Sequence, residues 1–130
     1  VDANVLLDVM TDDPEWCDWS ESRLAEIAED GLAINPIIYA ELTPGYRAPE
    51  DLDAALKGWS VERLLLPYDA AFPAGRAFVK YRQRGGVRRS PLPDFYIGAH
   101  AQVAGLTLLT RDGDRYREYF PDVSLICPES

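Results

Sequence analysis

The sequence is poor in histidine and cysteine, with one His and two Cys in 130 residues. Cys17 and Cys127 lie near opposite ends without metal-type spacing, which argues against a zinc site and against a disulfide framework. No apolar run approaches the roughly 18 residues of a membrane span. A leader of the secretory type, charged and then apolar, is not evident either. We therefore expect a reduced protein of the cytoplasm.

Acidic residues are missing from one stretch and concentrated in another. Residues 70–93 contain no Asp or Glu but six bases, whereas residues 1–30 contain ten acids and only Arg23 as a base. The net charge of −9 argues weakly against a dedicated nucleic-acid coat protein. A basic segment on an acidic protein suggests a local phosphate contact, and a solvated Arg-rich helix and loop explains it equally well. The residues concerned are Arg76, Lys80, Arg82, Arg84, Arg88 and Arg89.

Short apolar runs alternate with helical patterns along the chain, and 47% of the residues are hydrophobic. This alternation predicts one α/β domain over residues 1–130, with parallel strands, right-handed crossovers and helices on both faces in three layers. Val1–Asp2 reads as the end of a first strand, with upstream residues trimmed or replaced. We expect the other strands at 32–35, 61–66, 106–109 and 123–127, and helices at 4–10, 15–30, 37–42, 51–59, 69–84, 94–104 and 114–120.

The stretch from Pro91 to Asp112 contains the clearest sequence pattern of the chain, a helix followed by a short strand, with an acid at the start of the helix and another after the strand. Asp94 is predicted to open a helix, Gly105 to end it, and residues 106–109 to form a short buried strand. Asp112 follows that strand. Because ligands bind at the carboxyl ends of the strands in open α/β sheets, Asp94 and Asp112 are expected to converge there.

Two further acids share this placement at a strand end or an early helix turn: Asp2 and Glu41. Four carboxylates in one crevice repel one another and must take up protons or bind cations. With only oxygen ligands, Mg²⁺ or Mn²⁺ is favoured over zinc, and such an ion can activate water, orient a phosphodiester and shield the leaving oxygen. The basic segment could then hold the rest of an RNA or DNA strand by its phosphates, and the candidate contacts are Arg82, Arg84, Arg88 and Arg89.

Structural roles compete with these assignments. Taken alone, Asp94 is better explained by the helix dipole, and Asp112 by a turn before Gly113. Glu41 is harder to dismiss, because a single acid in an apolar helix is costly unless it faces a crevice. Asp2 is the most diagnostic, since the nearby Asn4 suggests a hydrogen bond to a metal ligand. His100 is interpreted as structural or exposed.

The sequence resembles PIN-domain ribonucleases, and most of all the VapC toxins of bacterial and archaeal type II toxin–antitoxin systems. The similarity rests on four segments in the family's order, which together span nearly the whole chain. They are Val1-Asp-Ala-Asn-Val-Leu-Leu7, Asn35-Pro-Ile-Ile-Tyr-Ala-Glu41-Leu, Pro93-Asp94 through Ala104-Gly105, and Leu109-Thr-Arg-Asp112.

This resemblance implies a parallel sheet of four or five strands, usually in a homodimer, and Mg²⁺- or Mn²⁺-dependent cleavage of RNA. The acidic set would be Asp2, Glu41, Asp94 and Asp112. Asn4, Thr110 and Arg111 match the supporting positions. A cognate VapB-type antitoxin would cover the crevice, often with a basic side chain reaching the carboxylates.

Two positions depart from the family pattern. Ala3 stands where Thr or Ser is most common. Arg115 stands three residues after Asp112, where many relatives carry another acid; Asp114 either substitutes or faces solvent, which leaves the number of metal ions open. A PIN-like module that binds RNA or protein without cleaving it is the alternative function. A phosphoacceptor or phosphatase domain with Asp2 as nucleophile fits less well, because its second acid and late Lys are missing.

Overall fold

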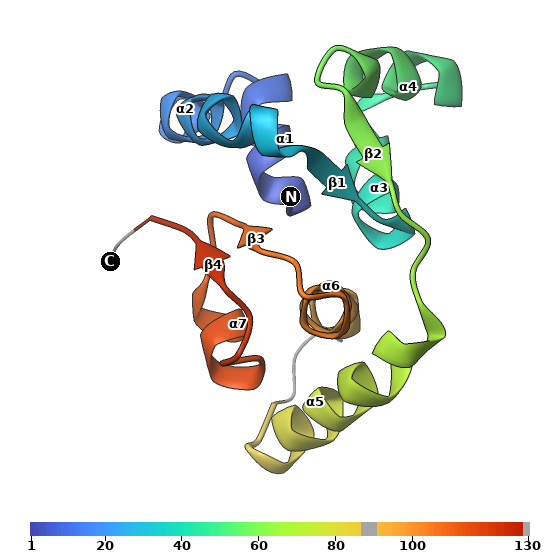
Figure 1. Ribbon diagram of the computed structural model, residues 1–130, viewed down its shortest axis with the longest axis vertical. Coiled ribbons are helices and arrows are strands. Elements are labelled where there is room, and N and C mark those ends of the chain that lie inside the picture. The colour runs from blue at the N-terminus through green and yellow to red at the C-terminus, as the bar shows by residue number, and fades with distance from the viewer. Residues whose placement is uncertain (87–90, 129–130) are drawn as a thin grey trace. The chain divides into compact units, whose positions relative to one another are not determined.

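The computed structural model describes residues 1–86 and 91–128 of the chain. Within these residues, every helix is too short or too polar to cross a lipid bilayer. Helices and short strands alternate (Figure 1) in the order α1 (Ala3–Met10), α2 (Cys17–Ile27), η1 (Ala28–Asp30), β1 (Leu32–Ile34), α3 (Pro36–Leu42), η2 (Thr43–Gly45), α4 (Pro49–Lys57), β2 (Val61–Arg63), η3 (Tyr68–Ala70), α5 (Ala71–Gln83), α6 (Leu92–Ala104), β3 (Leu108–Leu109), α7 (Asp114–Tyr119) and β4 (Leu125–Ile126).

The chain forms two compact units. Unit 1 comprises Val1–Leu65 and the three residues Leu109–Arg111. Unit 2 comprises Leu66–Leu108 and the described residues from Asp112 onward. The chain therefore leaves unit 2 after Leu108, contributes three residues to unit 1, and returns to unit 2 at Asp112.

Unit 1 is built on the parallel pair β1–β2, in which Leu32 lies opposite Val61 and Ile34 opposite Arg63. The turn from β1 into α3 follows directly from the sequence. Asn35 caps the helix by accepting a hydrogen bond from the Ile38 amide at 3.0 Å, and Pro36 occupies the first turn, where its missing N–H costs nothing. Helix α1 packs against α2 and α3, and its buried apolar side chains join those of the other elements in a core that includes Val5, Leu6, Leu24, Ile34, Ile38 and Leu42.

Unit 2 is organised around α6, which packs along α5 and contacts α7. The Phe95 ring on α6 packs against two rings of this unit, with its centroid 5.9 Å from that of Tyr81 and 5.0 Å from that of Tyr119. Gly98, one turn along, allows the buried Phe120 ring to lie directly on the helix, because a Cβ at this position would come within 2.5 Å of Phe120 Cδ2. An aromatic cluster thus fixes the segment that begins with Asp94.

The α/β class is confirmed, but the predicted single sheet of four to five strands is not what the described residues form. They contain two separate two-stranded pairs, β1–β2 and β3–β4. Strands of two or three residues make few ladder hydrogen bonds, so pairing remains local. Val1 and Asp2 lie next to two of these strands: the Val1 amino group donates to the Ala33 carbonyl at 2.9 Å, and the Asp2 amide donates to the Leu109 carbonyl at 2.8 Å.

Most element positions were predicted correctly and several boundaries were not. Helix α6 begins at Leu92, two residues before Asp94, because Pro93 is tolerated in a first helical turn. Gly105 ends that helix with φ +66°, as predicted. The helix expected over residues 69–84 begins at Ala71, and Asp69 lies in the preceding 3₁₀ turn. Helix α2 begins at Cys17, after a turn in which Asp13 accepts hydrogen bonds from the Glu15 and Trp16 amides at 2.9 Å.

Candidate functional site

Asp2 is the N-cap of α1 and is buried, with 6% of its surface exposed. Its Oδ1 accepts a hydrogen bond from the Ala3 amide at 2.8 Å, and its Oδ2 accepts one from the Thr110 hydroxyl at 2.8 Å. Thr110 follows β3 and is fully buried. Each carboxylate oxygen of Asp2 therefore accepts a hydrogen bond from a neutral donor, and these two bonds orient the side chain.

Asn4 supports this arrangement from the first turn of α1. Its Nδ2 donates to Thr110 Oγ1 at 3.3 Å, and its Oδ1 accepts from the Arg111 amide at 3.0 Å. Asn4 thus positions the Thr110 side chain and the Arg111 backbone after β3. Thr110 in turn positions Asp2 through its own hydrogen bond. The sequence suggested that Asn4 contacts a metal ligand; these contacts reach Asp2 through one intermediate residue.

Arg111 extends the network to a residue that the sequence analysis missed. Its Nε and Nη2 donate to the two carboxylate oxygens of Asp8 at 2.9 and 3.0 Å. Asp8 lies on α1 and is only 2% exposed. Ser20 of α2 also donates to Asp8, at 2.7 Å, and the Arg111 guanidinium lies 5.4 Å from the centre of the Trp16 ring. A bidentate ion pair with a buried carboxylate thus joins α1 to the segment after β3, and the bond from Ser20 adds α2.

A signal for Asp8 was present in the sequence. The residue interrupts an apolar run, Val5-Leu-Leu-Asp8-Val-Met10, in the same way that Glu41 interrupts the apolar residues of α3. The cost of burying a lone acid, which was applied to Glu41, applies equally to Asp8. Its partner Arg111 is 103 residues away, so the pairing itself could not be read from the sequence.

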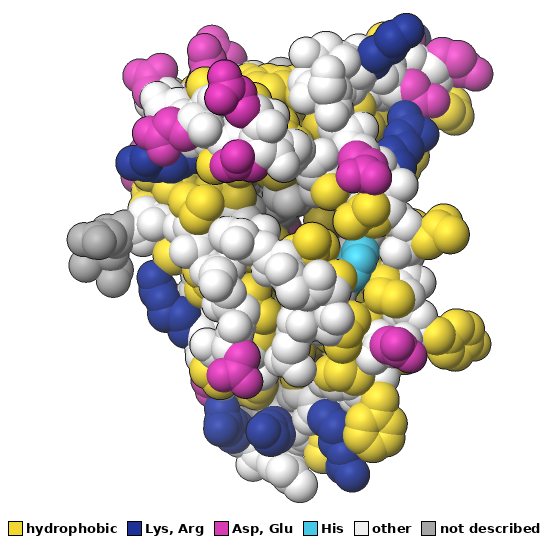
Figure 2. All heavy atoms as spheres, viewed as in Figure 1, with side chains coloured by type: hydrophobic (Ala, Val, Ile, Leu, Met, Phe, Trp, Pro, Cys, Tyr) yellow, Lys and Arg dark blue, Asp and Glu magenta, His cyan; other side chains and the backbone are white. Residues whose placement is uncertain are grey.

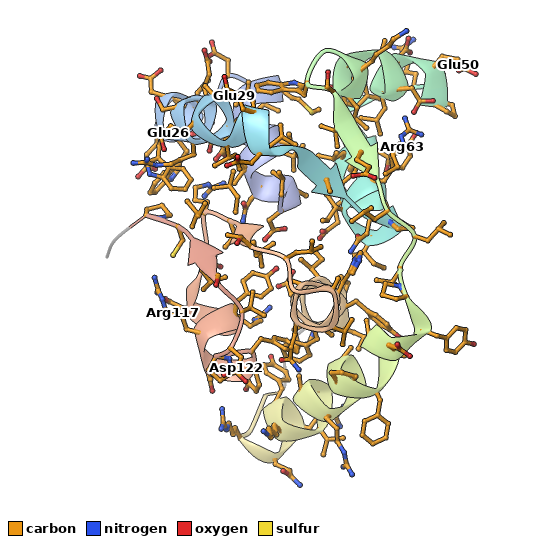
Figure 3. The ribbon with its side chains drawn as sticks, viewed as in Figure 1. Glu26, Glu29, Glu50, Arg63, Arg117 and Asp122 are labelled. Atoms are coloured by element: carbon orange, nitrogen blue, oxygen red, sulfur yellow. The ribbon has the colours of Figure 1, made fainter. Side chains whose placement is uncertain are left out.

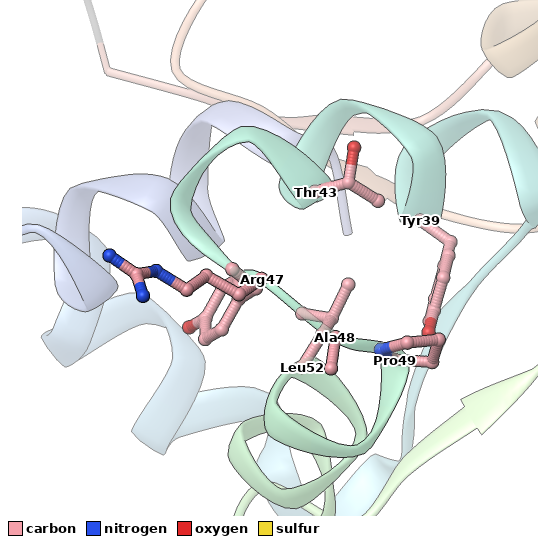
Figure 4. Close-up of a pocket in the computed structure, with 7 residues that line it drawn as sticks. Tyr39, Thr43, Arg47, Ala48, Pro49 and Leu52 are labelled. Carbon is pink, nitrogen blue, oxygen red and sulfur yellow. The ribbon is translucent and has the colours of Figure 1, made fainter.

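Glu41 lies on α3 in unit 1 and is partly exposed, although its Oε1 atom is shielded from solvent. The neighbouring side chains Tyr39 and Thr43 point elsewhere, because positions two residues away lie about 200° around a helix. They line a pocket of about 160 Å³ in unit 1 (Figure 4), together with Tyr46, Arg47, Ala48, Pro49 and Leu52. This pocket belongs to the other face of α3 from the one that carries Glu41.

Asp94 lies in the first turn of α6 and is paired with a cation. Arg115 of α7 donates from Nη1 to Asp94 Oδ2 at 2.7 Å, and the two side chains are 39% and 37% exposed. The Arg115 guanidinium also lies 5.8 Å from the centre of the Tyr81 ring. Asp94 therefore has a positive charge in direct contact with one carboxylate oxygen.

Asp112 and Asp114 lie on either side of the buried Gly113, at the start of α7 in unit 2, and both are exposed. Arg117 donates to Asp114 Oδ1 at 3.1 Å, an ordinary surface pair three residues apart on one helix. Figure 3 shows Arg117 on α7. Asp114 thus has a helix-surface role in the structure, next to the position predicted for a ligand.

The four predicted carboxylates are divided between the units: Asp2 and Glu41 belong to unit 1, and Asp94 and Asp112 to unit 2. Their donor chemistry fits a hard divalent cation, because all four supply oxygen ligands. In residues 1–86 and 91–128, however, no three His, Cys, Asp or Glu side chains are grouped as a ready-made metal site. The four residues therefore fit a hard divalent cation by the type of ligand atom that they supply.

The predicted RNA contacts are only partly described. Arg84 follows α5 and forms a 2.5 Å ion pair with Glu118, with its guanidinium 5.2 Å from the centre of the Tyr119 ring. The Arg82 guanidinium lies 5.8 Å from the centre of the Phe78 ring, and both residues are on α5. Arg88 and Arg89 lie outside the described residues. In Figure 2, acidic side chains gather over α2 and basic ones over the end of α5, as the charge pattern predicted.

His100 is a buried residue of α6, with 6% of its surface exposed. Burial lowers the pKa of its imidazole below the usual value, because the charged form loses solvation. The structural role expected for His100 agrees with its burial.

In unit 1, hydrogen bonds from Tyr39 and Arg63 to Asp53 lower the pKa of that carboxyl.

Comparison with known proteins identifies a family. The family described as "PIN domain" matches residues 1–120. No curated protein matches the chain significantly. A solved structure of VapBC2 from Rickettsia felis, bound to a DNA fragment from its promoter, contains a chain with a TM-score of 0.73 and 20% identity, covering 98% of this chain and 96% of that one. The DNA-bound VapBC from Salmonella typhimurium gives a TM-score of 0.69 and 23% identity, covering 97% and 94%.

Proposed function

The chain belongs to the PIN-domain family, and on that premise we propose that it is a metal-dependent endoribonuclease of the VapC type, the toxin of a type II toxin–antitoxin system. The observation that carries the proposal is the family match, which extends over residues 1–120 and therefore includes all four sequence motifs. The similar folds in two VapBC complexes support it. We propose further that residues 1–130 act as one PIN domain.

We assign the acidic centre to Asp2, Glu41, Asp94 and Asp112, with Mg²⁺ or Mn²⁺ as the ion and Asn4, Thr110, Arg111 and Asp114 as supporting residues. A bound divalent ion would supply a Lewis acid for the phosphodiester and would lower the pKa of water. The motif positions and the oxygen-only donor set support this assignment.

The chain's own contribution is best defined around Asp2. The Ala3 amide and the Thr110 hydroxyl hold the two carboxylate oxygens, Asn4 holds Thr110, and the ion pair of Arg111 with Asp8 holds the segment. Such support keeps a charged group in one orientation, so little reorganisation is needed when substrate and ion arrive.

The proposed substrate is RNA, with phosphate contacts from Arg82, Arg84, Arg88 and Arg89. The proposed partners are a VapB-type antitoxin and a second copy of the chain in a homodimer. Both thiols described in the structure are free, which suits the reducing cytoplasm, where we propose that the protein acts.

Cleavage of end-labelled total RNA with Mg²⁺ or Mn²⁺ tests the proposal. We expect the wild-type protein to cut, EDTA to abolish cutting, and Asp94→Asn to reduce it by about 100-fold or more through loss of a charged ligand. Asp122→Asn makes the same change at an exposed acid outside the proposed centre and should cut like wild type. Product ends carrying 5′-phosphate and 3′-hydroxyl would indicate attack by water, and a cyclic phosphate attack by the RNA 2′-hydroxyl.

A catalytically weak PIN-like binding module is the second candidate. It is favoured by one observation, the absence of a ready-made group of three metal-binding side chains in the described residues. RNA that stays intact with a folded wild-type protein free of antitoxin, but is retained in a gel-shift experiment, would replace the nuclease by this module. Cutting that is equal in the Asp94→Asn protein would show that the activity comes from another site or from a contaminant.

A further inference from the structure

Two aromatic side chains of unit 2 are strongly exposed to solvent. Tyr68 of η3 is 95% exposed, and Phe72 in the first turn of α5 is 72% exposed. Aromatic side chains usually bury a large area, and apolar surface left exposed on a folded protein commonly marks a binding site. Because η3 runs directly into α5, a spacing of four residues places the two side chains on the same side.

Phe72 shares its face of α5 with cationic side chains. Arg76 and Lys80 follow Phe72 at intervals of four residues, the spacing of neighbours on one helix face, and both are exposed. Ala74 and Ala77 lie on the opposite side of α5 and are buried. The helix therefore packs into unit 2 through its alanines and presents the aromatic and cationic side chains to solvent. Tyr68, Phe72, Arg76 and Lys80 are called the α5 face below.

The α5 face carries a net positive charge. The Arg76 guanidinium lies 5.3 Å from the centre of the Phe72 ring, within the range of a cation–π contact. Residues 68–83 contain three bases and a single acid, the exposed Asp69. In residues 1–86 and 91–128, no carboxylate forms an ion pair with Arg76 or Lys80. Hydrophobic and basic side chains are thus presented together over α5 (Figure 2), which suits an anionic partner.

We propose that the α5 face binds single-stranded RNA, with Tyr68 and Phe72 stacking on unpaired bases and with Arg76 and Lys80 contacting phosphates. The inference rests on the proposed function and adds to it a surface for the substrate, made of four residues beyond the arginines already assigned to phosphate contact. A positive surface with exposed aromatic rings suits single strands, because every base has a π face and every nucleotide carries a phosphate.

A second copy of the chain is a poorer partner for this face. Packing of the α5 face on its own equivalent about a two-fold axis would bring the same cations, Arg76 and Lys80, towards each other. Like charges brought together oppose association, and Asp69 is the single acid of this segment that could offset them. An RNA strand supplies the opposite charge and a planar group for each ring. Charge and ring chemistry therefore both favour RNA, and the proposed homodimer would use another surface.

Fluorescence anisotropy of a labelled single-stranded RNA measures binding apart from cleavage when EDTA is present. Residues 1–130 are titrated as wild type, Phe72→Leu and Phe72→Tyr. Leucine keeps an apolar side chain but has no π face, whereas tyrosine keeps the ring. We expect Phe72→Leu to weaken binding about tenfold and Phe72→Tyr to bind like the wild type. Tyr68→Leu and Tyr68→Phe should show the same contrast.

The salt dependence of binding tests the cationic part of the face. Arg76→Ala should reduce the slope of log affinity against log salt concentration by about 0.7, the value for one phosphate contact on a single strand. Arg47→Ala is the matched control, because Arg47 is an exposed arginine of unit 1 outside the α5 face. Its slope should equal that of the wild type. Circular dichroism checks that the variants are folded, which is expected because each substituted side chain is exposed.

Equal affinity of the wild type and Phe72→Leu, or an unchanged salt slope for Arg76→Ala, would overturn the inference. A wild type that still cuts RNA would then leave the proposed nuclease standing. Sedimentation velocity tests the competing occupant: a Phe72→Leu protein of lower mass than the wild type would assign the face to contact between copies and overturn the inference. If the wild type neither binds nor cuts RNA, the proposed function fails together with the inference.

Discussion

Two Arg–Asp pairs with the same chemistry lie in very different settings. The carboxylate of Asp8 is 2% exposed, meets Arg111 through two hydrogen bonds and also accepts one from Ser20. The carboxylate of Asp94 is 37% exposed and meets Arg115 through one short contact. A pair that is buried and fully bonded fixes structure, whereas a half-exposed pair can exchange its partner for water, an ion or a phosphate at little cost.

Asp2 and Asp94 also differ in the groups that contact their carboxylates. At Asp2, the Ala3 amide and the Thr110 hydroxyl donate to the carboxylate, and the charged pair of Asp8 with Arg111 lies next to Thr110 in the network. At Asp94, the charged group touches the carboxylate directly. The first arrangement fixes the orientation of a carboxylate by hydrogen bonds, and the second pairs a carboxylate with a cation.

The largest effect is expected from Arg111→Ala. This substitution leaves Asp8 buried without its guanidinium and should lower the free energy of unfolding by about 3 kcal/mol, near the low end for a broken buried pair because Arg111 is partly exposed. Urea unfolding measures the change. In the double variant Asp8→Ala with Arg111→Ala, the loss should be smaller than the sum of the two single losses. Additive losses would contradict the coupling of this pair.

Thr110→Val should have the next largest effect. The substitution keeps the shape of the side chain but removes the hydroxyl that donates to Asp2, so it should lower the free energy of unfolding by about 1–3 kcal/mol. Thr110→Ser retains the hydroxyl and serves as the control, with most of the difference restored. Equal stability of the Val and Ser variants in urea would mean that the hydrogen bond does not fix Asp2.

A much smaller effect is expected from Arg115→Ala, which changes the half-exposed pair. Because water can replace the guanidinium, the free energy of unfolding should change by less than about 1 kcal/mol. Measured beside Arg111→Ala under the same conditions, this variant gives a direct comparison of the two pairs. A loss as large as that of Arg111→Ala would show that Arg115 is a structural residue.

The smallest effect concerns pH and His100 of unit 2. Burial lowers the pKa of the folded imidazole below its unfolded value of 6.5, so the unfolded chain takes up the proton first as the pH falls. The contribution of His100 to stability is therefore complete above pH 6.5 and declines below it. His100→Gln should reduce the slope of unfolding free energy against pH in that range. An unchanged slope would assign the pH dependence to other groups.

Local structure was predictable where one or two residues decide it. Asn35 and Pro36 fix the start of α3, where a helix was expected over residues 37–42, and Gly105 ends α6 as predicted, because a cap, a fixed φ and a positive φ are properties of single residues. The start of α6 was misplaced by two residues, since Pro93 stops a helix in its interior but is accepted in its first turn. Short strands were recognised by their apolar runs, but their pairing into two separate pairs depends on distant residues.

The candidate site was predictable as a list of residues and much less so as a set of contacts. Motif resemblance singled out Thr110 and Arg111, yet their partners Asp2 and Asp8 lie more than 100 residues away in sequence. Asp8 was overlooked although the cost of a lone acid in an apolar run pointed to it. Arg115 was noted only as a departure from the family pattern, because no local rule predicts that it forms an ion pair with Asp94.

The brief passage of the chain through unit 1 at Leu109–Arg111 has a consequence for any attempt to divide the protein. A protease cut between Leu65 and Leu66 would separate almost all of unit 1 from the three residues that hold Asp2, Asn4 and Asp8 in place. A fragment of residues 1–65 would therefore carry Asp2 and Asp8 without the donors that Thr110 and Arg111 supply. We therefore expect the fragment of residues 1–65 to fold only when it is mixed with the fragment of residues 66–130.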